Sequence, residues 1–128
     1  MEKNMNLTGA EWSVMECLWE RAPRTGRELT EALGETRGWS RSTTLTLLSR
    51  LEAKGAVGRE SGGGKKTFRP LVSREDAALR ETEDLLSRVY RGSLSLLVSS
   101  FTEKRDLSRE ELDELSAVLK ELEGDRDA

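Results

Sequence analysis

The sequence predicts a mainly α-helical fold that contains one small β-hairpin. Apolar residues recur at helical spacing along most of the 128 residues. Three segments have the Ser/Thr-x-x-Glu spacing of a capping box, which marks helix starts: Thr8–Glu11, Thr25–Glu28 and Ser108–Glu111. A pair of strand-like runs follows the third helical segment. Three helices followed by a hairpin is the order of a winged helix-turn-helix. We therefore predict a winged-helix DNA-binding domain over residues 1–72 and a helical dimerisation region over residues 73–128.

The first two helices are predicted from their caps and from their apolar spacing. The first begins after Thr8, ends near Ala22-Pro23, and carries a core stripe of Trp12, Met15, Leu18 and Trp19. The second begins after Thr25 and runs through Leu33, where Gly34 is expected to stop it.

The third helix, over residues 40–55, has two distinct sides. Ser40 is a good N-cap and Gly55 a good C-terminal stop. At 100° per residue, one side carries Thr44, Leu47, Leu48 and Leu51, and the other carries Ser42, Leu45, Thr46 and Ser49. Small hydroxyls permit close approach to a surface, and arginine recognises phosphate or guanine, so this helix suits a DNA major groove. We predict DNA contacts by Arg41, Ser42, Thr43, Thr46 and Arg50.

The hairpin is predicted to form the wing. Its strands are expected at residues 56–59 and 67–70, joined by a Gly-rich loop over residues 61–66. Arg24–Gly26 is expected to add a third strand at the edge. Lys65 and Lys66 are placed at the loop tip and predicted to contact DNA.

The charge distribution supports nucleic-acid binding by the first region alone. The chain has a net charge of −3, but residues 1–72 carry +3 and residues 73–128 carry −6. Between residues 37 and 69 there are eight basic side chains and two acidic ones. A local positive field attracts phosphate, whereas the acidic region repels it.

The second region is predicted to contain two helices and a dimer interface. An apolar stripe predicts one long helix from Ser73 to Thr102, and a last helix begins after Ser108 and is closed by Gly124. Two such helices cannot bury their apolar faces alone. We predict that a homodimer buries Leu94, Leu97, Val98, Phe101, Leu112, Leu115, Leu119 and Leu122.

Several function classes receive little support from the composition. There is no histidine to act as a metal ligand or to activate Ser or Thr, and Ser61–Lys66 lacks the spacing of a phosphate-binding loop. We therefore predict no enzyme activity, no cofactor and no metal site. Cys17 is the single cysteine and is expected to act as a small hydrophobe. No apolar stretch approaches a membrane span and no signal peptide is expected, so we predict a cytoplasmic protein.

One alternative stays open beside operator binding. A winged helix can serve as a protein-interaction module without binding DNA. The basic balance of residues 37–69 favours DNA, because a protein-binding wing would not need it. Salt-sensitive binding to duplex DNA distinguishes the two.

Three sets of residues together resemble the penicillinase repressor (BlaI/MecI) family of bacterial transcriptional repressors. They are Ala10-Glu11-Trp12-x-Val14-Met15-x-x-Leu18-Trp19; Ser40-x-x-Thr43 with Thr46-x-x-x-Arg50-Leu51; and Leu97-Val98-x-x-Phe101 with Leu107 and Glu111-x-x-Leu115. The resemblance extends from about Leu7 to Leu122 and is therefore not confined to one motif.

The resemblance implies a homodimer that represses β-lactam-resistance-type genes from a pseudo-palindromic operator. It also implies relief of repression by a regulatory protease, with the matching bond at Ser100–Phe101. The family usually has Asn before that phenylalanine, and this chain has Ser100. Relatives often carry a basic residue facing DNA at the position of Leu45. The copper-sensing branch has a C-terminal cysteine motif, which this sequence does not contain.

Overall fold

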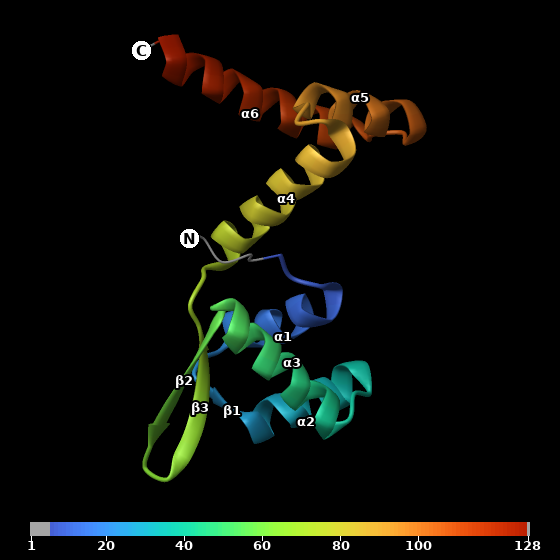
Figure 1. Ribbon diagram of the computed structural model, residues 1–128. Coiled ribbons are helices and arrows are strands. Elements are labelled where there is room, and N and C mark those ends of the chain that lie inside the picture. The colour runs from blue at the N-terminus through green and yellow to red at the C-terminus, as the bar shows by residue number, and fades with distance from the viewer. Residues whose placement is uncertain (1–5, 128) are drawn as a thin grey trace. The chain divides into compact units, whose positions relative to one another are not determined.

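The computed structural model describes residues 6–127, which form two compact units that divide between Leu85 and Leu86. The N-terminal unit contains α1 (Gly9–Glu20), β1 (Arg24–Thr25), α2 (Gly26–Arg37), α3 (Arg41–Lys54), β2 (Val57–Gly62) and β3 (Lys65–Pro70) (Figure 1). Helix α4 (Arg74–Tyr90) begins in this unit and continues past its boundary. The division into a DNA-binding domain over residues 1–72 and a dimerisation region over residues 73–128 stays a prediction.

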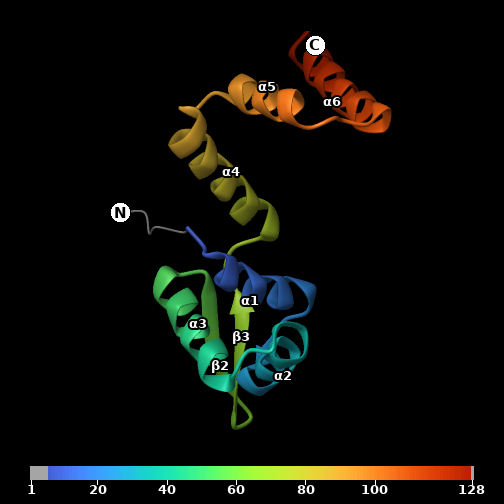
Figure 2. The same cartoon turned by 90° about the vertical axis from the view of Figure 1, so that its right-hand side faces the viewer.

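The three strands form one antiparallel sheet in the order β1-β3-β2, with Arg24 opposite Phe68 and Arg59 opposite Phe68 on the other side. This arrangement confirms the winged helix-turn-helix, including its third strand at the edge. The tip of the β2–β3 hairpin extends past the helices in both views (Figure 1, Figure 2).

Both N-terminal capping boxes form as predicted. In the first, the Thr8 hydroxyl accepts from the Glu11 backbone N–H at 3.1 Å, and the Glu11 carboxylate accepts from the Thr8 N–H at 2.8 Å. Thr25 and Glu28 make the same reciprocal pair at the start of α2.

The predicted end of α2 at Gly34 is wrong. Gly34 is helical, and α2 continues to Arg37, where Gly38 adopts a φ of 69°. The Gly38 N–H donates to the Gly34 carbonyl at 3.1 Å, and the Trp39 N–H donates to the Leu33 carbonyl at 3.4 Å. These bonds satisfy carbonyls that a helix end leaves free. Glycine inside a helix costs only about 1 kcal/mol relative to alanine, so it does not by itself end one.

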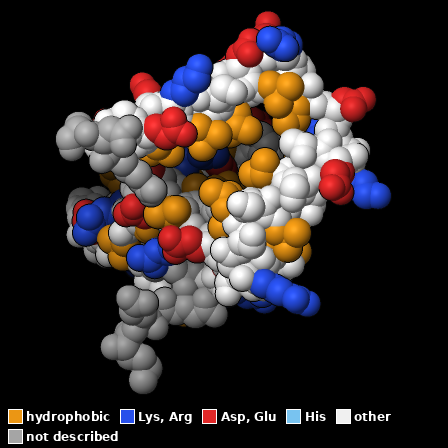
Figure 3. Space-filling view, turned by 90° about the horizontal axis from the view of Figure 1, so that it is seen from above, with side chains coloured by type: hydrophobic (Ala, Val, Ile, Leu, Met, Phe, Trp, Pro, Cys, Tyr) orange, Lys and Arg blue, Asp and Glu red, His pale blue; other side chains and the backbone are white. Residues whose placement is uncertain are grey.

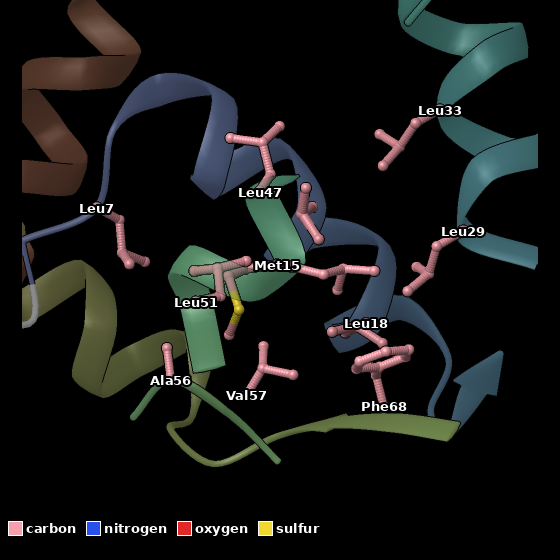
Figure 4. Packing of buried hydrophobic residues seen from close by; sticks show 12 residues of the cluster. Leu7, Met15, Leu18, Leu29, Leu33, Leu47, Leu51, Ala56, Val57 and Phe68 are labelled. Carbon is pink, nitrogen blue, oxygen red and sulfur yellow. The ribbon is translucent and has the colours of Figure 1, made fainter. Parts of the chain in front are cut away.

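The core lies between the three helices and the sheet (Figure 4). Met15 and Leu18 from α1 are buried, while Trp12 and Trp19 of the predicted stripe are partly buried against the same cluster. Other elements contribute Leu29, Leu33, Leu47, Leu48, Leu51, Ala56, Val57 and Phe68. Because α3 contributes three of these leucines, its orientation is set by the core.

The start of α4 is joined to this core. The Trp19 indole donates to the Val72 carbonyl at 2.9 Å, and Ala77 is buried. The Arg74 guanidinium contacts the Glu16 carboxylate at 3.0 Å and lies 5.9 Å from the centre of the Trp12 ring. These contacts hold the first turns of α4 against α1.

The C-terminal unit differs from the prediction at two points. The expected helix from Ser73 to Thr102 is interrupted, so that α5 (Leu94–Lys104) is separate from α4. Arg91 and Gly92 have φ values of 53° and 79°, and the Ser93 hydroxyl caps α5 by accepting from the Leu96 N–H at 3.0 Å. Helix α6 (Arg109–Asp127) follows the Ser108 cap as predicted, but Gly124 lies inside it and does not close it.

Candidate DNA interface

Helix α3 has the two sides that its sequence predicts. Thr44, Leu47, Leu48 and Leu51 are all buried. The outward residues are all exposed: Arg41, Ser42, Thr43, Leu45, Thr46, Ser49 and Arg50. The Ser40 hydroxyl caps the helix by accepting from the Thr43 N–H at 3.2 Å, and it lies 3.0 Å from the Thr43 hydroxyl. The structure therefore presents a hydroxyl-rich surface edged by two arginines.

A buried ion pair positions the C-terminal end of α3. The Lys54 ammonium donates to the Glu11 carboxylate and to the Asn6 carbonyl, each at 2.6 Å. The Glu11 side chain is 1% exposed. Burial raises the pKa of the Glu11 carboxyl, but hydrogen bonds from Lys54 and Thr8 outweigh that effect and hold the pKa below its usual range. The sequence pattern does not reveal this pair, because Glu11 and Lys54 are far apart in the chain.

The single acidic residue of α3 is also neutralised. The Arg59 guanidinium on β2 contacts the Glu52 carboxylate at 2.7 Å and lies 5.5 Å from the centre of the Phe68 ring. The Glu52–Arg59 pair joins α3 to the wing. It also removes the negative charge that would otherwise repel phosphate from this helix.

The cations of residues 37–69 fall into two groups. Lys54, Arg59 and Arg69 are engaged in ion pairs. Within the part of the chain that the structure describes, no ion pair engages the others, which are Arg37, Arg41, Arg50, Lys65 and Lys66. Four of these five are the cations that the sequence assigns to DNA, so their charges are available to a ligand.

The wing differs in detail from the expected long loop. Its turn consists of Gly63 and Gly64, whose φ values of 59° and 77° suit a two-residue hairpin. Lys65 and Lys66 therefore belong to β3 and not to the loop tip, and they pair with Gly62 and Ser61. Both side chains are exposed. Successive strand residues point to opposite faces, so the two lysines are expected on opposite faces of the hairpin.

The predicted dimerisation residues lie on α5 and α6, and nearly all are exposed. Leu94 is 60% exposed and Phe101 is 47% exposed, and the same holds for Val98, Leu112, Leu115, Leu119 and Leu122, while Leu97 is half-buried. Hydrophobic side chains gather on the surface in the space-filling view (Figure 3). The Ser100–Phe101 bond lies inside α5, where the Arg105 guanidinium is 5.3 Å from the Phe101 ring centre.

Other candidate sites offer less chemistry. Among the described residues, no three or more Cys, Asp or Glu side chains are grouped so that they could hold a metal ion. Cys17 is half-buried against the core, and burial raises the pKa of its thiol, which suits the expected role as a small hydrophobe. Within residues 6–127, no helix is both long enough and apolar enough to cross a bilayer.

These features define a winged-helix DNA-binding protein. Its third helix presents an exposed face of small hydroxyls, and Arg41 and Arg50 on that helix and Lys65 and Lys66 on the wing form no ion pair with a described residue. The family comparison identifies this protein more closely. Residues 7–121 match the penicillinase repressor family, and the chain belongs to that family.

Individual relatives agree with this assignment over nearly the full chain. The methicillin resistance regulatory protein MecI of Mammaliicoccus sciuri is 32% identical over 117 residues, which cover 91% of this chain and 95% of that protein. The penicillinase repressor of Bacillus licheniformis is 32% identical over 121 residues, which cover 94% of each chain.

Two solved structures match more than half of the chain. The DNA-binding domain of the repressor BlaI matches with a TM-score of 0.54 at 30% identity, covering 59% of this chain and 93% of that one. The monomeric form of Bacillus licheniformis BlaI in complex with the blaP half-operator matches with a TM-score of 0.51 at 30% identity, covering 56% and 87%.

Proposed function

We propose that this protein is a homodimeric transcriptional repressor that binds a pseudo-palindromic operator. The observation that carries the proposal is the exposed face of α3, which combines small hydroxyls with Arg41 and Arg50, neither of which is in an ion pair with a described residue. Two copies of α3 would enter successive major grooves, and the wings would contact the flanking backbone. Bound over a promoter, such a dimer excludes the transcription machinery sterically. Because operators lie on the chromosome, the proposal places the protein in the cytoplasm.

The proposed dimer rests on the apolar surface of α5 and α6. Each of the two helices carries several large apolar side chains that are exposed, and an accumulation of this kind marks an interaction site. The acidic balance of residues 73–128 makes this region unsuited to DNA. A second copy of the same surface covers it without any other partner.

Family membership supports a proposal about the regulated genes and the inducing step. We propose β-lactam-resistance-type genes as targets and cleavage at Ser100–Phe101 by a regulatory protease as the release. The bond lies inside α5, so a protease needs α5 to unwind locally before it can act. Cleavage there would remove the end of α5 and all of α6 from the DNA-binding unit.

A genomic selection tests the repressor proposal directly. Purified full-length protein is mixed with fragments of the source genome at moderate salt, and the bound fragments are sequenced. The proposal expects a recurring palindromic site next to promoters, with affinity that falls steeply as salt rises. Binding of no duplex DNA at any salt concentration would instead favour the protein-interaction module.

We expect two substitutions on α3 to have different effects. Arg50→Ala should weaken binding to all duplexes and lower the salt slope by about one unit, because a phosphate contact is lost. Thr46→Ala should change sequence preference, with a loss of roughly 1–3 kcal/mol at the contacted base pair. Titrations at several salt concentrations, on selected and random duplexes, measure both effects. Unchanged affinity and preference in both variants would contradict the assignment of this face.

The wing lysines should contribute without sequence preference. Replacing both Lys65 and Lys66 with alanine should reduce affinity similarly for selected and random duplexes, because phosphate contacts carry no base information. Their positions on β3 add that the two single variants should differ, since the side chains are expected on opposite faces. Binding titrations of the single and double variants measure this. Loss of selected binding alone would mean that the wing contacts base edges.

A further inference from the structure

Leu45 is an apolar residue in the hydroxyl-rich face of α3. Its side chain is 36% exposed, and its outward neighbours are Ser42, Thr46 and Ser49. Leu45 is not a member of the buried cluster, which takes Leu47, Leu48 and Leu51 from the same helix. Leu45 therefore offers a large, partly exposed apolar side chain to a ligand of this face.

Leu45 lies next to the start of α2. A Cβ placed on Gly26, the first residue of α2, would stand 3.6 Å from the Leu45 Cδ2 atom. Leu45 also forms part of a groove of about 510 Å³ between the two helices, whose other lining residues are Gly26, Arg27, Thr30, Glu31 and Arg41. One side of the leucine thus lies close to α2, and the groove leaves another side open.

We propose that Leu45 determines specificity by contacting the 5-methyl group of a thymine in each operator half-site. This inference rests on the proposed repressor function. Among the four bases, thymine alone presents an apolar group in the major groove. Leu45 lies in the first half of α3, and the N-terminal residues of a recognition helix are those that contact base edges. The leucine thereby distinguishes T·A from C·G without a hydrogen bond, while the neighbouring hydroxyls contact polar edges.

The test removes the methyl group from the DNA and its partner from the protein. Full-length protein first selects duplexes from a random-sequence library. Each thymine of the selected sequence is then replaced singly by deoxyuridine, which lacks only the methyl group. At one thymine of each half-site, we expect replacement by deoxyuridine to weaken binding of the wild type about three- to fivefold relative to the unmodified duplex. Burial of one methyl group contributes roughly that factor. Leu45→Ala should bind the thymine duplex more weakly and should lose no further affinity with uracil at that position.

Two further variants keep the result interpretable. Ser49→Ala, on the same face, should keep the full sensitivity to uracil. Leu45→Met keeps an apolar side chain and should also stay sensitive, so a folding defect in Leu45→Ala would not obscure the outcome. The inference is overturned if no thymine is sensitive in the wild type, or if Leu45→Ala shows the wild-type loss at every position. If the selection enriches no sequence at all, the proposed repressor function fails as well.

Discussion

A chain that ends at Ser100 should bind its operator roughly 10²–10⁴-fold more weakly than the full chain, because the link between two half-site contacts is lost. The truncation removes Phe101 and all of α6, and with them most of the exposed apolar surface of the C-terminal unit. The N-terminal unit keeps its own buried core. We therefore expect a folded monomer that binds each half-site independently. Sedimentation and operator titration of residues 1–100 against the full chain measure both effects.

A point variant tests the same surface without truncation. Leu119→Asp places a charge on the apolar face of α6 and should also yield a weakly binding monomer. Lys120→Ala changes the adjacent residue, which is exposed, and should leave the dimer intact. If residues 1–100 remain dimeric and bind the operator as tightly as the full chain, α5 and α6 do not form the dimer interface.

Lys54→Met should lower the free energy of unfolding by about 3–5 kcal/mol at neutral pH, because it leaves the Glu11 carboxylate buried without its cationic partner. The cost arises from the folded state, where Glu11 is 1% exposed and one of its oxygens, Oε2, accepts no hydrogen bond from residues 6–127. Since Lys54 also orients the end of α3, DNA affinity should fall with stability. Chemical denaturation followed by tryptophan fluorescence measures the change.

The matched control is the second capping box. Glu28 is the capping-box glutamate of α2, as Glu11 is of α1. It forms an ion pair with Arg21 at 3.2 Å, but both of these side chains are exposed. Arg21→Met should therefore destabilise the fold far less than Lys54→Met does, because an exposed pair contributes little. Equal losses in the two variants would show that burial of Glu11 does not determine the effect.

The pH dependence has a definite sign. In the wild type the pKa of Glu11 lies below its usual value of 4.5, so the ionised carboxylate stabilises the fold above that pH. This contribution is lost as the pH falls through the lowered pKa. In Lys54→Met the hydrogen bond from Lys54 is lost, so the effect of burial should raise the pKa of Glu11. Protonation of Glu11 should then remove the cost of burying its charge. The stability difference between wild type and variant should shrink as the pH falls toward 4.5.

The amino-acid sequence alone determined the features that depend on neighbouring residues. Helix starts at Thr8, Thr25 and Ser108 follow from side chains that bond to backbone groups three residues away. The buried and exposed sides of α3 follow from the helical period of 3.6 residues, which places residues three or four positions apart on the same face. The assignment of the DNA-binding face depends on this local pattern together with the charge balance of residues 37–69.

Tertiary structure decided the features that depend on distant contacts or on a balance of small energies. Gly34 and Gly124 lie inside helices, whereas Gly38 ends α2. A glycine inside a helix costs only about 1 kcal/mol, so contacts elsewhere in the fold decide which glycine ends the helix. The pairing of Glu11 with Lys54 joins residues 43 positions apart, so it exists only once α1 and α3 are packed together. The placement of Leu45 beside Gly26 likewise follows from the packing of α3 on α2, which a one-dimensional pattern does not contain.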